Sequence, residues 1–407
     1  MAALLLAGTA HGTAQAQGAP PVRDLRGQDQ FEPIGGRIGS FLLFPSFETR
    51  IEYDDNVLAL PDGGTGDGEV TFRGAARLQS QWQRHSLEMN AYIQQNFHAR
   101  LTSEDAMEGG ARMNGRLDID RNTTARLIAS VDSMVENRAE ITAAANALEP
   151  TRFRRADALL TVAHDFGRVR LTGDAEILKL DFDDVPARDG GVIRQDFRNS
   201  TWVRSALTAS LELSPRVSGL VRGQIDRLTF NDDPTDPFDR DTTGYALEGG
   251  VRLEFDQLLF GEARVGVLHR KVDDPTGRGL TGLSFGANLT WLATPLTTVR
   301  LFADRQVEEG GSQLISGNVR AQGRVSVSHE LLRNLTLEGQ ASYARIDTIG
   351  LLNITAEEYT LMADATWRLD RNFRVFARAD RFERFTGDDF FRGFARNRVM
   401  AGVRVEF

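Results

Sequence analysis

Residues 247–255 read LEGGVRLEF, where every second residue is apolar or glycine and the residues between them include Glu248, Arg252 and Glu254. Alternation of this kind is typical of a β-strand with one apolar and one polar face, because successive side chains of a strand point to opposite sides. The apolar residues of an amphipathic helix would instead recur every three or four positions. The stretch therefore predicts a strand.

The same period of two continues from about Ser40 to the end of the chain. Residues 70–79 (VTFRGAARLQ), 87–94 (LEMNAYIQ) and 401–407 (AGVRVEF) alternate in the same way. A tilted strand needs about 9–11 residues to cross a membrane, and each alternating segment is long enough. The pattern predicts 18 strands, near residues 40–53, 68–82, 86–97, 108–119, 123–136, 153–166, 168–182, 196–213, 216–230, 243–255, 257–271, 280–292, 297–305, 314–330, 334–345, 357–369, 372–385 and 393–407.

The connections between these segments are alternately short and long. The short ones are residues 83–85, 120–122, 167, 214–215, 256, 293–296, 331–333 and 370–371. The longer ones include residues 54–67, 137–152, 183–195, 231–242 and 346–356. A soluble sandwich has no reason to sort its loops in this way, whereas a transmembrane barrel has tight periplasmic turns and longer outer loops. The fold class predicted is all-β, an antiparallel transmembrane β-barrel of about 18 strands.

Proline positions support this interpretation independently, because proline has no N–H to donate to a β-ladder. Of the 12 prolines, Pro45 alone falls inside a predicted strand. The others precede the first strand or lie in connections, at positions 20, 21, 33, 61, 150, 186, 215, 234, 237, 275 and 295.

Composition narrows the class of protein further. The 407 residues include no cysteine, which excludes a disulfide scaffold, a thiolate metal site and a cysteine nucleophile. The formal net charge of −9 argues against a nucleic-acid partner, which would favour a basic face. No internal run of about 18 apolar residues exists, so a helical membrane protein is excluded as well.

The N-terminus indicates export from the cytoplasm. Residues 2–7 (AALLLA) form an apolar stretch, and Ala14-Gln15-Ala16 is a small-x-small cleavage site, which together predict a signal peptide over residues 1–16. The basic segment that normally precedes such a stretch is missing, so the signal peptide is interpreted as truncated. Residues 17–38 are rich in proline, glycine and charge and are predicted to be a periplasmic lead, with the barrel over 39–407.

Placing the apolar register toward lipid leaves a densely charged register toward the lumen. Unpaired charges in a dry interior would cost several kcal/mol each, so this face is expected to line water, with opposite charges paired across strands. Two interpretations of its arginines stay open: an ion-pair lattice that stiffens the wall, or a track for an anionic or hydroxyl-rich solute. The lumen-lining candidates are Arg73, Arg77, Arg112, Arg116, Arg126, Arg252, Arg320, Arg324, Arg374 and Arg378.

Other candidate sites are weaker. The outer loops are acidic, for example at Asp54-Asp55 and Asp232-Asp233, and could hold Ca²⁺, but their spacing matches no EF-hand and solvated loops are the simpler interpretation. The six histidines form no HExxH pair and no GxSxG motif occurs, so no catalytic residue, metal site or cofactor is predicted. Aromatic residues near strand ends fit the girdles at membrane interfaces, namely Trp82, Phe97, Tyr245, Trp291, Tyr343, Trp367 and Phe407.

Residues 39–56, GSFLLFPSFETRIEYDDN, resemble the start of the outer-membrane "beta-barrel porin 2" family, in which such a strand ends in a Tyr-Asp-(Asp)-Asn corner. The last residues, 405–407, are similar to the C-terminal aromatic signal that the barrel assembly machinery recognises, with Phe407 as its final residue. The resemblance implies an outer-membrane location in a Gram-negative bacterium, with lipids and lipopolysaccharide as surroundings. Because members of the family often accompany exopolysaccharide export genes, it also implies a role in translocation beside periplasmic export components.

Two function classes remain open at this point. One is a porin-like conduit for a polysaccharide or for small polar solutes. The other is a barrel that transports nothing, either a surface enzyme such as a lipid hydrolase or an anchor with a plugged lumen. The two classes differ in whether the protein conducts ions.

Overall fold

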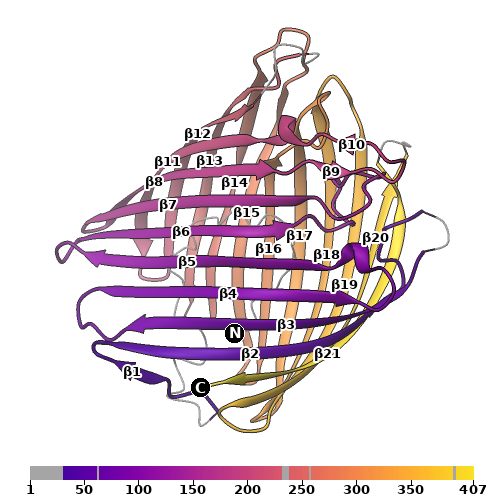
Figure 1. Ribbon diagram of the computed structural model, residues 1–407. Helices are drawn as coiled ribbons and strands as arrows, with labels where there is room; N and C mark the ends of the chain where they lie inside the picture. Colours follow the sequence, from indigo (N-terminus) through magenta and orange to yellow (C-terminus); the bar gives the residue numbers. More distant parts are fainter. Residues whose placement is uncertain (1–30, 62–63, 232–237, 256–257, 388–390) are drawn as a thin grey trace.

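The computed structural model describes residues 31–61, 64–231, 238–255, 258–387 and 391–407. The proposed signal peptide and residues 17–30 of the proposed lead lie outside this part of the chain. Figure 1 shows one large barrel, in which the near-wall strands β2 to β8 cross the direction of the far-wall strands β15 to β20, as expected when strands tilt relative to the barrel axis.

Within the described residues, 18 antiparallel strands form the wall. They are β2 (Phe41–Asp54), β3 (Asp67–Ser80), β4 (Ser86–His98), β5 (Ala106–Asp118), β6 (Thr123–Val135), β7 (Arg152–Phe166), β8 (Val169–Phe182), β11 (Ser200–Ser214), β12 (Val217–Phe230), β13 (Thr242–Phe255), β14 (Leu259–Val272), β15 (Leu280–Thr294), β16 (Thr297–Glu308), β17 (Ile315–Leu332), β18 (Leu335–Gly350), β19 (Thr355–Arg368), β20 (Phe373–Thr386) and β21 (Phe394–Glu406).

Each strand pairs with the next along the chain, and the last strand closes the barrel against the first. The closing ladder between β2 and β21 runs from Ser46 opposite Glu406 to Asp54 opposite Arg398. Closure leaves no free sheet edge, which is the requirement for a sheet that spans a membrane. The predicted fold class and strand order are confirmed.

The short elements lie at the ends of the barrel. β1 (Gly36–Ile38) pairs with β2 where β21 has ended, so the lead predicted to reach residue 38 gives way to the sheet at residue 36. The hairpin of β9 (Val185–Pro186) and β10 (Val192–Ile193) and the 3-10 turns η1 (Thr102–Glu104) and η2 (Asp196–Arg198) lie in the longer connections. None of the described helices is long and apolar enough to cross a membrane.

The two ends of the barrel differ in their connections, as predicted. One end has tight turns such as that of Gly167, whose positive φ of 76° is easily adopted by glycine, and we call this end the short-turn side. The other end carries the longer connections and is called the long-loop side. Its connection between β18 and β19 is shorter than predicted, because both strands continue to residues 350 and 355.

The outward register is apolar and exposed, as a lipid-facing surface requires. Aromatic side chains predicted to form interfacial girdles all point outward and are 39–59% exposed, namely Trp82, Phe97, Tyr245, Trp291, Tyr343, Trp367 and Phe407. Pro45 also faces outward in β2, one residue before the ladder with β21 begins, and its carbonyl accepts the N–H of Phe407 at 3.0 Å. Its missing N–H therefore interrupts no ladder bond with β21.

Candidate functional site

The lumen is the candidate functional site, because the polar register of every wall strand faces it. On most of this surface, arginine and carboxylate side chains alternate across neighbouring strands. Arg204 of β11 lies 3.0 Å from Glu176 of β8, and Arg222 of β12 reaches past β11 to Asp174, at 2.9 Å. Such pairing removes most of the desolvation cost of placing charges inside the barrel.

Six of the ten arginines predicted to line the lumen belong to this ion-pair lattice. Their carboxylate partners lie within 4.0 Å, and for Arg374 and Arg77 the partner is the same residue of the closing strand. The pairs are Arg77 with Glu406 (3.6 Å), Arg116 with Asp118 (2.9 Å), Arg252 with Glu262 (2.9 Å), Arg320 with Glu358 (2.6 Å), Arg374 with Glu406 (3.8 Å) and Arg378 with Asp364 (3.1 Å).

The other four have no carboxylate within 4.0 Å in the described part of the chain. Arg73 donates to the amide of Gln94 at 3.3 Å, and Arg126 donates to Asn114 at 2.9 Å. Arg324 lies over an aromatic ring, with 5.5 Å from its guanidinium carbon to the ring centre of Phe302. The fourth is Arg112.

Arg112 makes no hydrogen bond or ion pair within the described residues, and its side chain is exposed. Arg73, Arg112 and Arg126 come from β3, β5 and β6, which are neighbours on one wall with only β4 between them. We call these three residues the basic wall. Among the described residues no carboxylate lies within 4.0 Å of these three guanidinium groups, because β4 places Asn90 and Gln94 between them, and Glu88 of β4 and Glu48 of β2 lie farther away.

The connection between β6 and β7, residues 136–151, crosses the long-loop end of the lumen, and we call it the mouth loop. Arg198 of η2 is fully buried and binds Glu136 of this loop at 2.6 Å and Glu309 beyond β16 at 2.7 Å. On the opposite side, Arg384 of β20 donates to the carbonyl of Ala139. The loop therefore spans the mouth from η2, at the start of β11, to β20.

Electrostatics in the mouth loop depend on this enclosure. Burial opposes the charge of Arg198, but Glu136 and Glu309 outweigh it and raise the pKa of its guanidinium. Removing one partner from a buried pair of this kind costs about 3–5 kcal/mol, because the other charge is left uncompensated. The ion pairs of Arg198 therefore hold the mouth loop in place, because breaking them would cost this free energy.

The mouth loop also contains a carboxyl whose pKa is raised by its surroundings, that of Glu140. Desolvation raises the pKa of Glu140 to about 8, and the nearby carboxylates of Glu358 and Glu136 add to the effect, while Arg320 opposes it. Glu140 is therefore largely protonated at neutral pH.

Apolar side chains also fill part of the lumen, a feature that the sequence analysis missed. The inward residues Leu178, Leu180 and Phe182 at the end of β8 form a buried cluster with Val307 and Val319, which come from the opposite wall. The long-loop ends of β16 to β18 must therefore bend into the barrel. The inward register of β8 is apolar in the sequence of residues 177–182 (ILKLDF), and this signal could have indicated a covered surface.

The lumen is consequently asymmetric along its axis. On the long-loop side the inward residues Thr71, Gln94, Arg270 and Asn318 are at most 3% exposed. On the short-turn side Arg116 remains about half exposed. Water can reach the basic wall from the short-turn side, while the mouth loop and the bent strands obstruct the other end.

No group of three histidine, aspartate or glutamate residues in the described part of the chain is arranged to hold a metal ion. Of the acidic residues in the outer loops, those at positions 232, 233, 236, 388 and 389 lie outside the described residues. Asp273 is bound by Arg227 at 2.6 Å, and Asp54 faces Arg396 at 3.6 Å. These two carboxylates act as ion-pair partners.

The family of the chain follows from a match over nearly its whole length. Residues 29–407 match the family model described as "Putative beta-barrel porin 2", and the chain belongs to this family. It is therefore a porin-like β-barrel of the kind found in the outer membrane of Gram-negative bacteria. The resemblance noted over residues 39–56 is confirmed.

Solved structures with a similar arrangement come from Pseudomonas aeruginosa. OccK3 (OpdO) is 14% identical over 90% of this chain and 96% of its own, with a TM-score of 0.43. OccK2 (OpdF) is 12% identical over 90% and 98%, with a TM-score of 0.45, and the siderophore receptor PirA is 10% identical over 92% and 81%, also with 0.45. Such values do not indicate a shared substrate. No curated protein matches the chain.

Proposed function

We propose that the protein is a non-enzymatic channel that passes small anionic solutes across the outer membrane, with the basic wall as its selective surface. The observation that carries this proposal is the contrast between Arg112, exposed and without a carboxylate partner, and the paired arginines elsewhere in the lumen. A cluster of uncompensated positive charge beside water raises the local concentration of anions. Guanidinium groups also match the geometry of carboxylate and phosphate oxygens.

Entry would be from the long-loop side, past the mouth loop. The fastening of this loop by Arg198 and Arg384 favours solutes small enough to pass while it stays in place. An exported polysaccharide, which the family resemblance suggests, would need the loop to leave the mouth. For this reason we favour small anions as the solute and treat an exported glycan as the alternative.

The test is a measurement of ion selectivity in planar bilayers under a salt gradient. Replacing Arg73, Arg112 and Arg126 together by Gln should move the reversal potential toward cation selectivity, by several-fold in the permeability ratio near 0.1 M salt. The shift should fade at 1 M salt, where the Debye length falls from about 10 Å to about 3 Å.

A matched control removes the same charge from outside the lumen. Arg154, Arg345 and Arg381 are outward-facing, and their side chains are 63%, 51% and 48% exposed. Their triple replacement by Gln should leave the reversal potential unchanged. If both triple variants fold and neither alters the reversal potential, the basic wall is not the selective surface.

The second candidate function is an anchor with a plugged lumen, and the mouth loop is the observation that favours it. A plugged barrel would show no conductance in the same bilayers, even when the heat-modifiable folded form is inserted. A barrel enzyme would also lack conductance but would release product from lipid, which thin-layer analysis of the bilayer lipids detects.

A further inference from the structure

The wall has a gap between β15 and β16 on the long-loop side. Their ladder runs from Thr294 opposite Thr297 to Gly286 opposite Asp304 and stops there. Residues 280–285 of β15 continue to pair with β14, and residues 305–308 of β16 continue to pair with β17. We call the space between these two unpaired segments the slit.

The slit arises because the two sides of the wall diverge. Val307 of β16 and Val319 of β17 are at most 6% exposed and pack in the cluster of Trp202 and Leu228, which face the lumen from β11 and β12. The end of β16 has therefore moved inward, while β15 stays in the wall beside β14. Because the packed apolar cluster holds the end of β16 in this inward position, the separation between β15 and β16 is part of the native fold.

The side chain of Arg305 spans the slit. The Nη1 atom of Arg305 donates to the carbonyl of Leu283, with 2.8 Å between nitrogen and oxygen. The same nitrogen lies 2.7 Å from the position that a Cβ on residue 282 would occupy, so Gly282 leaves the room that the guanidinium needs. Arg305 links the two strands where the ladder is missing, and a rotation of its side chain would remove this link.

The position of the slit relative to the membrane follows from the aromatic girdle. Tyr245 points outward, is 51% exposed and lies opposite His269, which in turn lies opposite Thr281 at the start of the slit. Tyrosine side chains concentrate at the level of the lipid head groups. The slit therefore connects the lumen with the head-group level of the leaflet on the long-loop side, and Leu283 lies on its lipid-facing rim, 53% exposed.

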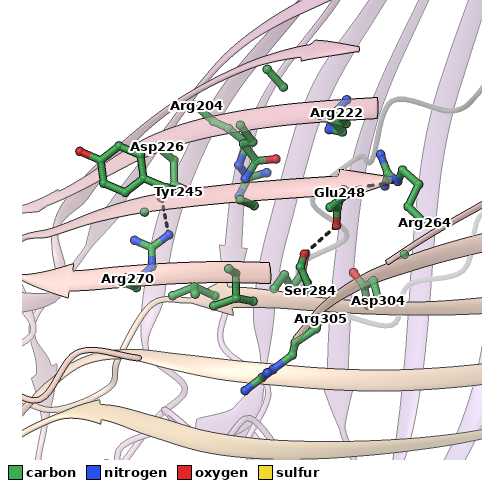
Figure 2. Close-up of a pocket in the computed structure, with 18 of the residues that line it drawn as sticks. Arg204, Arg222, Asp226, Tyr245, Glu248, Arg264, Arg270, Ser284, Asp304 and Arg305 are labelled. Atoms are coloured by element: carbon green, nitrogen blue, oxygen red, sulfur yellow. Dashed lines mark hydrogen bonds and ion pairs between the residues drawn. The ribbon is translucent and has the colours of Figure 1, made fainter. Parts of the chain in front are cut away.

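A hollow lies behind the slit, as Figure 2 shows. Its empty volume is about 990 Å³, counting space open to solvent. Most of its charges are paired, as in Arg270 with Asp226 and Arg264 with Glu248. The carboxyl of Asp304, at the base of the slit, forms no ion pair among the described residues, and the guanidinium of Arg305 bonds a carbonyl in place of a carboxylate.

Asp304 is 6% exposed, and its Oδ1 atom has no hydrogen-bond partner among the described residues. A buried polar atom without a partner costs free energy, so most such atoms in native proteins are satisfied by a group, a water or a ligand. Asp304 lines the hollow, and a rotation of its carboxyl would present this oxygen to a hydrogen-bond donor that entered there.

We propose that the slit and the hollow bind an amphiphile that enters from the membrane, with a hydroxyl-bearing head and an alkyl chain. The head lies in the hollow and donates a hydroxyl to Asp304 Oδ1. The chain passes between β15 and β16, along Leu283 and Phe285, into the lipid. The guanidinium of Arg305 turns from the carbonyl of Leu283 to oxygens of the head. An occupant with a polar head and an alkyl chain fits best, because the slit lies between the apolar lipid and the polar hollow.

Photo-cross-linking tests the binding site directly. The protein carries p-benzoylphenylalanine at Gln306, which lines the hollow, and is embedded in lipid nanodiscs that contain radiolabelled dodecyl maltoside. The matched control carries the same amino acid at Asn90, on the lumen face of β4 far from the slit. We expect labelling at position 306 at least ten-fold above that at position 90, and a several-fold decrease in it with Asp304→Asn.

The route is tested by closing the slit. The chain has no cysteine, so Leu283→Cys with Arg305→Cys supplies a unique pair on the outward rim, which a short bismaleimide can bridge. The unbridged double variant, which lacks the Arg305 guanidinium, sets its own reference for labelling at position 306, and bridging should lower this labelling at least ten-fold. Because both samples are the same folded protein, a folding defect cannot produce this difference.

Equal labelling at positions 306 and 90, or labelling at 306 that the bridge does not reduce, would overturn the proposal. The measurement involves no ion flow. A failure here would leave the anion selectivity of the basic wall untouched, and a failure of the selectivity test would leave this result unaffected.

Discussion

At the scale of single residues, the neighbours of an arginine decide what it can do. Arg378 and Arg112 both face the lumen, but Arg378 has a carboxylate at 3.1 Å and Arg112 pairs with none in the part of the chain that the structure describes. The first is a neutral part of the wall, and the second exposes its charge to water. The strand period predicts that both point inward, but the partner of each depends on which residue the register places opposite.

Glu140 gives a residue-scale prediction about pH. Its folded-state pKa of about 8 exceeds its ordinary value of 4.5, so the closed mouth loop binds this proton more tightly than an open loop does. The contribution of Glu140 to loop closure is complete below pH 4.5 and is lost as the pH rises through about 8. We expect single-channel recordings to show more frequent opening, or larger conductance, between pH 6 and 9.

In Glu140→Gln this pH dependence should disappear, because Gln stays neutral throughout. Glu149 lies in the same loop, is exposed and supplies the control: Glu149→Gln should retain the response of the natural protein. A pH response that survives in Glu140→Gln would mean that another group governs the loop.

At the scale of elements, β16 to β18 form the barrel wall at one end and pack inside the barrel at the other. Their short-turn ends alternate between lipid and lumen as the sequence indicates. Their long-loop ends are buried on both faces, with Asn318 and Val319 each 1% exposed. This double burial accounts for the slit beside β16 and for the continuation of β18 to Gly350.

The closing strand β21 carries the element-scale prediction on assembly. Phe407 follows its last residue, is 59% exposed toward lipid and donates its backbone N–H to Pro45 of β2. Phe407→Ala should reduce the heat-modifiable folded band in the outer membrane several-fold, because the terminal aromatic is expected to guide insertion of this strand. Phe373→Ala removes a lipid-facing phenylalanine of similar exposure from β20, 44% exposed, and should leave the folded band unchanged. Equal effects of the two variants would argue against a special role of the terminus.

At the scale of the whole molecule, every long connection gathers at one end of the barrel. Outer-membrane barrels place long loops outside the cell and tight turns in the periplasm. An epitope tag inserted between Gly190 and Gly191, at the exposed tip of the β9–β10 hairpin, should therefore bind antibody on intact cells. A tag at Pro215, in the turn between β11 and β12, should bind only after the outer membrane is permeabilised. The reverse binding pattern would show that the barrel is inserted in the opposite orientation, with the short-turn side outside the cell.

The sequence by itself determined the barrel, its 18 strands and the direction in which side chains such as Arg73 and Arg112 point. These properties follow from local rules: a period of two, the exclusion of proline from ladders and the sorting of loop lengths. Only the tertiary structure decided which of the described arginines stay without a carboxylate, that residues 136–151 cross the mouth, and that β15 and β16 separate at Asp304. Each of these depends on residues far apart in the chain, such as Arg198 with Glu309 or Val307 with Trp202, and a periodic pattern carries no information about which distant partners meet.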